Sequence, residues 1–383
     1  MQVYDQRPVM TGEHFVKGDE AVVEGAIAAG CRFYAGYPIT PSSEIAERMS
    51  WRMPLVGGEY IQMEDEMGSL AAVIGASCAG AKAMTATSGP GFSLMMEHIG
   101  LAAMMEIPCV VVDIQRGGPS TGLPTLTSQG DMMQARWGSH GDYESVAYAP
   151  STVQEMFDFT IKAFNTAERL RTPVLVMADQ VIGQMTAKLV IPPEEDIEVL
   201  YRPIPDVPPE EYKPYDSSYL VPPMALAGDG YSVHMTGLTH NDFGYPETTA
   251  KGQEALLSRI VRKIREGEAA IIECEEKLLA DADVGLVVYG STVGPAWEAV
   301  KAAREEGIKA GILRLITPWP FPTDVVRRVS EEVDSLLVIE ANLGQILHPV
   351  REHSQCPVQH LGLPGGRIFH PSEILMTLKK VVS

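Results

Sequence analysis

The alternation of strand-like and helix-like segments between residues 18 and 180 constrains the fold of this chain more than any other feature. Short apolar runs that suit buried strands are separated by longer stretches that suit helices. This alternation is typical of a parallel sheet with helices on both faces, so the sequence predicts a doubly wound α/β domain. The expected helices cover 18–30, 66–80, 92–105 and 153–171, and the expected strands cover 32–36, 81–86, 108–114 and 173–178.

Residues 186–250 break this pattern, because prolines recur through them. Such a stretch is typical of an extended connector that wraps a neighbouring surface. After it, a second α/β unit is expected. The predicted divisions are a first domain over 1–185, a connector over 186–252 and a second domain over 253–383. The second domain has expected strands at 284–289, 311–316, 335–341 and 357–361, and expected helices near 295–306, 342–354 and 371–382.

The charge and the amino-terminal sequence narrow the class of protein. A formal net charge of -20 argues against a nucleic acid or an anionic membrane as a partner. No apolar run reaches the length of a membrane span, and Met1 to Asp5 form neither a basic segment nor an apolar signal core. We therefore expect a cytoplasmic enzyme subunit.

The five cysteines are scattered along the chain and never form a Cys-x-x-Cys pair. Three of them lie in apolar helices or strands, where a free thiol behaves as a small hydrophobic group. This pattern favours neither a disulfide framework nor an iron-sulfur cluster held by this chain alone. If the protein takes part in redox chemistry, we expect the metal centres on other subunits.

Glu66 is the strongest candidate for chemistry. It opens a helix that is apolar on every side, so we expect that helix to be buried and Glu66 to lie at the mouth of a dry interior. A buried carboxylate is costly without a partner. Thiamine diphosphate offers one, because a carboxyl group must protonate its pyrimidine ring. The alternative is that Glu64, Asp65 and Glu66 only form an acidic helix start.

Two loops add candidate ligand contacts. The loop Thr87 to Gly91 contains Ser88, Gly89 and Pro90, and its small residues let backbone approach a flat ligand closely. Arg116 follows the strand 108–114, at the end where ligands bind in open α/β sheets, and its guanidinium matches a carboxylate. Arg116 could instead be an ordinary solvated arginine.

The segment after the strand 32–36 contains Tyr37, Pro38, Ile39 and Thr40. Prolines fix such a loop, and the hydroxyl residues that follow can cap the next helix or present N–H groups to an anion. A helix cap alone would explain the same residues.

A second half of a thiamine diphosphate site is missing. Such sites hold Mg²⁺ and the diphosphate with Gly-Asp-Gly at a strand end and an Asn about one βα unit later. Here Gly228-Asp229-Gly230 lies in the connector and is followed too soon by Asn241, so a turn is the better interpretation. We predict no metal site on this chain and expect the diphosphate and the metal on another subunit.

Taken together, these segments closely resemble the alpha subunits of 2-oxoacid:ferredoxin oxidoreductases, and most of all the 2-oxoglutarate branch. The resemblance implies that Thr40 and Arg116 hold the substrate carboxylate, that Glu66 activates thiamine diphosphate, and that residues from about 253 form a transketolase C-terminal-like domain. It also implies that the first domain is of the pyrimidine-binding type, with the cofactor contacts in the loops above. The motifs that carry it are Tyr37 to Glu44, Glu66, Gln115 to Gly122, Gln129-Gly130-Asp131 and Thr236 to His240.

The implied reaction is the CoA-dependent oxidative decarboxylation of 2-oxoglutarate to succinyl-CoA and CO₂, with electrons passed to ferredoxin. The implied partners are a beta subunit with the diphosphate and Mg²⁺ sites, a separate gamma subunit and a ferredoxin-like delta subunit, with the iron-sulfur clusters on beta or on delta.

Several alternatives stay open at this point. The same chemistry on pyruvate or a branched-chain 2-oxoacid would use the same motifs. A non-oxidative thiamine-dependent decarboxylase or synthase would share the loop 88–91, and a non-catalytic scaffold subunit would share the fold. The second carboxylate of 2-oxoglutarate would need its own partner, for which Arg136, His140 and His240 are candidates that the sequence does not rank.

Overall fold

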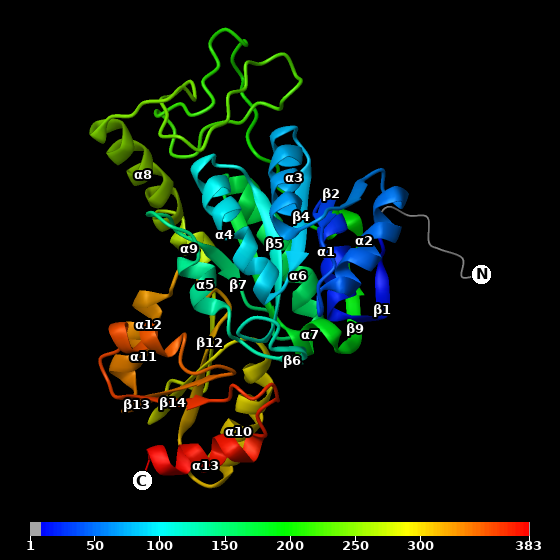
Figure 1. Cartoon of the computed structure of the whole chain (residues 1–383). Helices are drawn as coiled ribbons and strands as arrows, with labels where there is room; N and C mark the ends of the chain where they lie inside the picture. Colours follow the sequence, from blue (N-terminus) through cyan, green and yellow to red (C-terminus); the bar gives the residue numbers. More distant parts are fainter. Residues whose placement is uncertain (1–8, 383) are drawn as a thin grey trace, which may run out of the picture.

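The computed structural model describes residues 9–382 and shows two α/β units joined by a long connector (Figure 1). The larger sheet has seven strands, of which six run parallel. A seventh, β6 (Leu123–Thr127), pairs antiparallel with β5. The doubly wound fold class is confirmed. The parallel strands, in spatial order, are β3 (Glu59–Gln62), β2 (Cys31–Gly36), β4 (Lys82–Thr87), β5 (Cys109–Gly117), β8 (Pro173–Asp179) and β7 (Val146–Tyr148).

Alternate side chains of β5 explain why helices cover both faces of this sheet. Val110 and Val112 pack into one apolar core with the helices α1, α2 and α6, whereas Val111 packs into a second core with α3 and α4. This period of two is what a strand buried on both sides requires. The helices are α1 (Gly18–Ala28), α2 (Ser43–Leu55), α3 (Glu66–Cys78), α4 (Gly89–Met104) and α6 (Val153–Leu170), with the short helices α5 (Met132–Trp137) and α7 (Gln180–Gln184).

The second unit is a five-stranded sheet in which only β10 runs antiparallel. Its two faces are again covered by helices, with α10 and α13 on one side and α11 and α12 on the other. In order its strands are β10 (Cys274–Lys277), β12 (Ala310–Leu315), β11 (Val284–Val288), β13 (Ser335–Glu340) and β14 (Val358–Gly362), and its helices are α10 (Val293–Glu305), α11 (Thr323–Glu332), α12 (Leu347–His353) and α13 (Pro371–Val381).

The connector begins with regular structure and then becomes irregular. Strand β9 (Thr186–Ile191) pairs antiparallel with β1 (Gly12–Lys17), and a 3₁₀ turn covers Glu194–Asp196. Residues 197–249 then form loops that lie at the top of Figure 1 and lead into α8 (Ala250–Arg265) and α9 (Glu268–Ile271).

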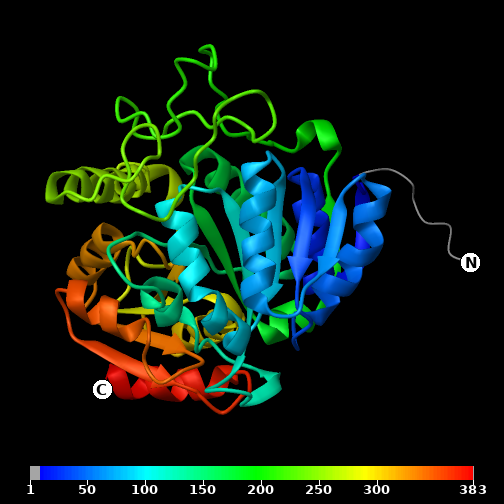
Figure 2. The ribbon, with the colours of Figure 1, turned by 45° about the horizontal axis from the view of Figure 1, so that its top comes forward.

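Two buried arginines hold the connector against the first unit. Arg171 donates hydrogen bonds to the carbonyl groups of Pro214 and Pro222 (3.0 and 2.9 Å). Arg202 pairs with Glu168 at 2.6 Å. Proline lacks an N–H but keeps its carbonyl, so a proline-rich segment can still be held by donors of this kind. Figure 2 shows the loops lying across one end of the large sheet.

Two expectations about helices are wrong. The helix expected over 342–354 begins only at Leu347, because the Asn342 side chain accepts hydrogen bonds from the backbone of Gly344 and Gln345 and so favours a turn. Helix α3 is not covered on every side: Met67 is 42% exposed, and Ala71 and Gly75 on the same face are exposed as well. Within the described chain, this small apolar face meets solvent.

The turn predicted in the connector is present. Gly228-Asp229-Gly230 is a turn, with positive φ angles at both glycines. Within residues 9–382, no helix combines the length and the apolar character needed to cross a bilayer. The prediction about Met1 to Asp5 lies outside the described residues. The domain limits 1–185, 186–252 and 253–383 stay a prediction.

Candidate active site

The carboxyl ends of neighbouring parallel strands bring the predicted site segments to one edge of the large sheet. The loop after β2 carries Tyr37 to Thr40, and the segment after β3 leads to Glu66. The loop after β4 carries Ser88 to Pro90, and β5 ends next to Arg116. Ligands of open α/β sheets bind at this edge.

Glu66 is the first residue of α3 and has a buried carboxyl group. Asp65 caps the helix by accepting a hydrogen bond from the Gly68 N–H at 2.7 Å, which fixes where the helix begins. Glu66 is only 5% exposed, and no cation pairs with it among residues 9–382. Burial raises the pKa of the Glu66 carboxyl above its usual value, and the charge of Asp65 adds to the rise. This carboxyl group is therefore suited to hold and donate a proton.

Gly91 creates the space that the Glu66 carboxyl occupies. A Cβ atom at position 91 would lie 2.4 Å from Glu66 Oε1 and 2.2 Å from Thr87 Oγ1. The buried Thr87 hydroxyl has no hydrogen-bond partner among the described residues. Glu66 and Thr87 thus place a buried carboxyl group and an unsatisfied hydroxyl beside one glycine, where a ligand could meet them.

Ser88, Gly89 and Pro90 form the start of α4. The Ser88 hydroxyl donates to the backbone carbonyl of Ile114 at 2.7 Å, so this side chain anchors the loop to β5 and is already engaged. Pro90 suits the first turn of a helix, where its missing N–H costs nothing. The structure thus explains these residues as a fixed loop, and their predicted cofactor contacts stay a prediction.

Arg116 and Thr40 are brought together. Arg116 is 6% exposed, and its Nη1 donates a hydrogen bond to the backbone carbonyl of Thr40. Its Nε has no partner within the described part of the chain. Thr40, Tyr37 and Pro38 are exposed, and Ile39 is half-buried. The guanidinium therefore bridges two loops while keeping donor capacity for an anion.

The sequence reasoning missed a pair of carboxyl groups beside Arg116. The pKa of Asp113 is raised well above its usual value. The main cause is burial, and the second is the negative charge of Asp131. Burial also raises the pKa of Asp131 to about 6. The charge of Asp131 thus disfavours ionisation of Asp113. The signal was a lone aspartate inside the otherwise apolar strand 108–114.

A buried polar network fastens the second unit to the same sheet edge. The Asp179 carboxylate accepts hydrogen bonds from the Ser291 N–H (2.6 Å) and from Gln129 Nε2 (2.9 Å). Gln129 Nε2 also donates to the carbonyl of Tyr289 at 2.9 Å, and its Oε1 accepts from the N–H of Ala341 at 2.8 Å. A fully satisfied network of this kind fixes one relative position of the two units.

The three candidates for a distal substrate carboxylate have other neighbours. Arg136 pairs with Glu144 at 2.9 Å, His140 lies 3.5 Å from Glu97, and His240 lies in the connector. Among the described residues, no hydrogen bond or ion pair joins them to the Glu66 and Arg116 edge, so their role stays a prediction.

Comparison with known proteins decides the family. The family described as "Pyruvate flavodoxin/ferredoxin oxidoreductase, thiamine diP-bdg" matches residues 24–257, and "Pyruvate:ferredoxin oxidoreductase core domain II" matches residues 282–374. The 2-oxoglutarate synthase subunit KorA of Methanothermobacter thermautotrophicus is 50% identical over 97% of this chain and 100% of its own length. This chain belongs to the 2-oxoacid:ferredoxin oxidoreductase family. The family prediction made from the motifs is confirmed.

Further relatives of this oxidoreductase subunit agree. The KorA subunit of Methanocaldococcus jannaschii is 53% identical over 94% of this chain and 97% of its own length. A solved 2-oxoglutarate:ferredoxin oxidoreductase from Magnetococcus marinus superposes with a TM-score of 0.93 at 34% identity, over 97% of this chain and 66% of that one. A split-gene transketolase is similar in fold alone, with a TM-score of 0.53 at 12% identity.

The residues present fit the thiamine diphosphate that this family's first domain binds. The Glu66 carboxyl is buried, has a raised pKa and pairs with no cation among the described residues, and Gly91 leaves the room that this carboxyl occupies. Within residues 9–382, no three His, Cys, Asp or Glu side chains gather as metal ligands. The chain thus offers a partner for the cofactor's ring, and its described part offers no metal cluster for the diphosphate.

Proposed function

We propose that this chain is the alpha subunit of an enzyme that converts 2-oxoglutarate, CoA and oxidised ferredoxin to succinyl-CoA, CO₂ and reduced ferredoxin. The choice of 2-oxoglutarate as substrate rests on the sequence identity of 50–53% to subunits named 2-oxoglutarate synthase. The identity to a ketoisovalerate oxidoreductase subunit of Methanothermobacter thermautotrophicus is lower, at 38%. The solved relative from Magnetococcus marinus has 2-oxoglutarate, coenzyme A and succinyl-CoA bound, which supports CoA as the co-substrate.

Glu66 holds the proton on which the reaction depends. Bound thiamine diphosphate supplies the carbon nucleophile and the electron sink for decarboxylation. Burial raises the pKa of Glu66, which favours a carboxyl group that can share its proton with the cofactor's pyrimidine nitrogen. The neighbouring segments with Tyr37, Pro38, Ile39, Ser88, Gly89 and Pro90 would shape the walls around the ring.

Arg116 and Thr40 orient the substrate. A guanidinium that already donates to the Thr40 carbonyl is held in one direction, so its remaining N–H groups can meet the 1-carboxylate of a 2-oxoacid at little entropic cost. The second unit, fixed by Asp179 and Gln129, closes this edge of the sheet and limits the access of water.

Other subunits complete the enzyme. We assign the diphosphate, Mg²⁺ and iron-sulfur clusters to a beta subunit, and we expect a gamma subunit and a ferredoxin-like delta subunit in a cytoplasmic complex. The exposed apolar face of α3, beside Glu66, supports a partner at this edge of the sheet.

Two other functions use the same site. Pyruvate or a branched-chain 2-oxoacid would need the same contacts at Arg116, and a non-oxidative thiamine enzyme would need only Glu66. The reconstituted complex, assayed with 2-oxoglutarate, pyruvate and 2-oxoisovalerate and a one-electron acceptor, separates them. A kcat/KM at least tenfold higher for 2-oxoglutarate is expected, and a preference for another acid, or turnover without an electron acceptor, contradicts the proposal.

A second experiment tests the shared site. Because Gly228-Asp229-Gly230 is a turn in the connector, the chain has no usable Gly-Asp-Gly and Asn pair, so calorimetry with thiamine diphosphate and Mg²⁺ should show weak or no binding to the isolated chain and clear binding to the complex. Tight, magnesium-dependent binding to the single chain would contradict the assignment of the diphosphate to a partner.

A further inference from the structure

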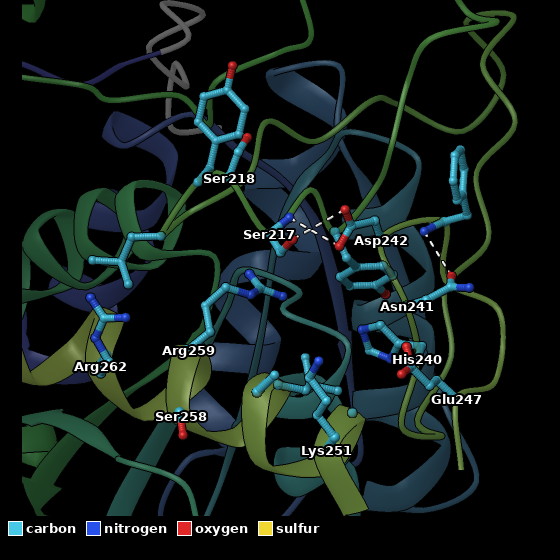
Figure 3. Close-up of a pocket in the computed structure, with 17 residues that line it drawn as sticks. Ser217, Ser218, His240, Asn241, Asp242, Glu247, Lys251, Ser258, Arg259 and Arg262 are labelled. Atoms are coloured by element: carbon cyan, nitrogen blue, oxygen red, sulfur yellow. Dashed lines mark hydrogen bonds between the residues drawn. The ribbon is translucent and has the colours of Figure 1, made fainter. Parts of the chain in front are cut away.

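A large cavity lies between α8 and the connector, away from the candidate active site. Its volume is about 920 Å³, within the range of small-molecule sites. Beneath it lie Glu106 and Arg171, which directly precede β5 and β8, so the cavity is at the amino end of the sheet and Glu66 is at the carboxyl end. In Figure 3, Lys251, Arg259 and Arg262 project from α8, and Ser217, His240 and Asp242 come from the connector.

His240 offers a buried and unsatisfied acceptor to this cavity. Its ring is 4% exposed and packs on Tyr215, with 3.9 Å between the ring centroids. Its Nδ1 lies 2.7 Å from the carbonyl oxygen of Leu238; because a carbonyl only accepts, Nδ1 carries the hydrogen. Burial lowers the pKa of His240, which favours the neutral ring. Nε2 therefore presents a lone pair, for which residues 9–382 supply no donor.

The floor of the cavity carries excess positive charge. The Glu106 carboxylate accepts from Arg259 at 2.6 and 3.1 Å and from Lys263 at 2.8 Å, and Arg171 donates to its backbone carbonyl. Burial alone would raise the pKa of Glu106, but the charges of Lys263 and Arg259 hold this pKa at about 2. Three buried cations thus surround one carboxylate, and the surplus favours an anion in the cavity above.

The rim adds further cations on the same face of α8. Lys251 is exposed and forms no ion pair with the described residues, and Arg262 pairs only with exposed Glu266. Two acids share the rim with these three cations, Lys251, Arg259 and Arg262, so the cations outnumber the acids there. Asp242 accepts from the backbone and the hydroxyl of Ser217, and Glu247 lies within hydrogen-bond distance of the Thr249 hydroxyl.

Two half-exposed aromatic rings stand at the mouth, Phe243 (47% exposed) and Tyr219 (49%). A flat heterocycle can pack against such rings. A simple polyanion would use the cations of this cavity, but it would use neither these rings nor the lone pair of His240, which calls for a hydroxyl or amine donor.

We propose that this cavity is a binding site for a nucleoside phosphate. The phosphates would meet Arg259, Arg262 and Lys251, a ribose hydroxyl would donate to His240 Nε2, and the base would pack against the aromatic rings at the mouth. Since the cavity lies at the opposite end of the sheet from Glu66, a nucleotide bound there does not reach the Glu66 site and acts as an effector or an assembly factor. The free nucleotide and the nucleotide end of CoA share this chemistry.

Calorimetry of the full chain with ADP tests the site, and CoA in a parallel arm distinguishes the two sources. Arg262→Glu should weaken ADP binding at least tenfold, and His240→Phe, which keeps a ring against Tyr215, should weaken it about tenfold by removing the acceptor. Arg327→Glu, a charge reversal at an exposed position of α11, is the matched control and should leave ADP binding unchanged.

Three outcomes would overturn the site. The first is no binding of ADP or CoA at millimolar concentration. The second is binding that both Arg262→Glu and His240→Phe leave intact. The third is tripolyphosphate binding as tightly as ADP, which would reduce the cavity to a general anion site. Melting curves of each variant confirm that the chain stays folded, and none of these outcomes depends on the identity of the 2-oxoacid.

Discussion

Gly91 and Glu66 depend on each other: a Cβ atom at position 91 would lie 2.4 Å from Glu66 Oε1 and 2.6 Å from its Cγ. The two residues come from the starts of α4 and α3, which follow different strands. The glycine of the loop after β4 therefore leaves the room in which the Glu66 carboxyl group lies.

Gly91→Ala should displace the Glu66 carboxyl and reduce activity. We expect a loss of about 1 to 3 kcal/mol in the free energy of unfolding from overpacking, and a fall in kcat of the complex toward that of a Glu66 variant. Gly75→Ala is the control, because a Cβ atom there meets nothing within 4 Å, and it should not destabilise the chain. Full activity of Gly91→Ala would show that Glu66 tolerates another position.

Glu66→Gln should preserve assembly and cofactor occupancy, because glutamine keeps the size of the side chain. It cannot donate a carboxyl proton, so exchange of the thiazolium C2 proton in the complex should slow by about 10²-fold to 10⁴-fold. Quenched-flow NMR measures this rate, with the exposed residue Glu64, changed to Gln, as the matched control. Exchange at the wild-type rate would mean that Glu66 does not activate the cofactor and is only an acidic residue at the start of a helix.

Arg116→Lys should weaken substrate binding by about 1.5 to 3 kcal/mol, because lysine cannot donate to the Thr40 carbonyl and grip a carboxylate with two parallel hydrogen bonds. Steady-state kinetics of the complex measure the change in kcat/KM. The exposed Arg327→Lys serves as the control. If Arg116→Lys leaves both KM and kcat unaltered, Arg116 lies outside the substrate site.

Glu106→Gln should destabilise the chain by about 3 to 5 kcal/mol at pH 7, because Lys263 and Arg259 would be left buried without a counter-charge. The folded-state pKa of Glu106, about 2, lies below its usual value of 4.5. Its contribution to stability is therefore complete above pH 4.5 and is lost as the pH falls toward 2. Urea unfolding at pH 7 and pH 3 measures the free energy of unfolding, and the difference between wild type and variant should be smaller at pH 3.

The control for that series is Glu305→Gln, an exposed position at the end of α10. It should change the free energy of unfolding by less than about 0.5 kcal/mol at either pH. A difference in the free energy of unfolding that is small or independent of pH would mean that Lys263 and Arg259 move into solvent when Glu106 loses its charge.

The sequence by itself determined the α/β class and the edge at which the site forms. Apolar runs such as 108–114 can only be strands buried on both faces, and parallel strands place their carboxyl ends together. The loops with Thr40, Glu66 and Arg116 therefore had to meet at one edge, whatever the details of packing. Local periodicity was sufficient for this because it reports how many faces of an element are buried.

Only the tertiary structure decided which side chains touch. The closeness of Glu66 to Gly91, the raised pKa of Asp113 beside Asp131, and the exposed face of α3 all depend on how separate elements pack. The unpaired acceptor of His240 above the Glu106 cluster likewise joins residues more than a hundred positions apart. A local pattern carries no information about such pairs, since burial and charge compensation are properties of the assembled chain.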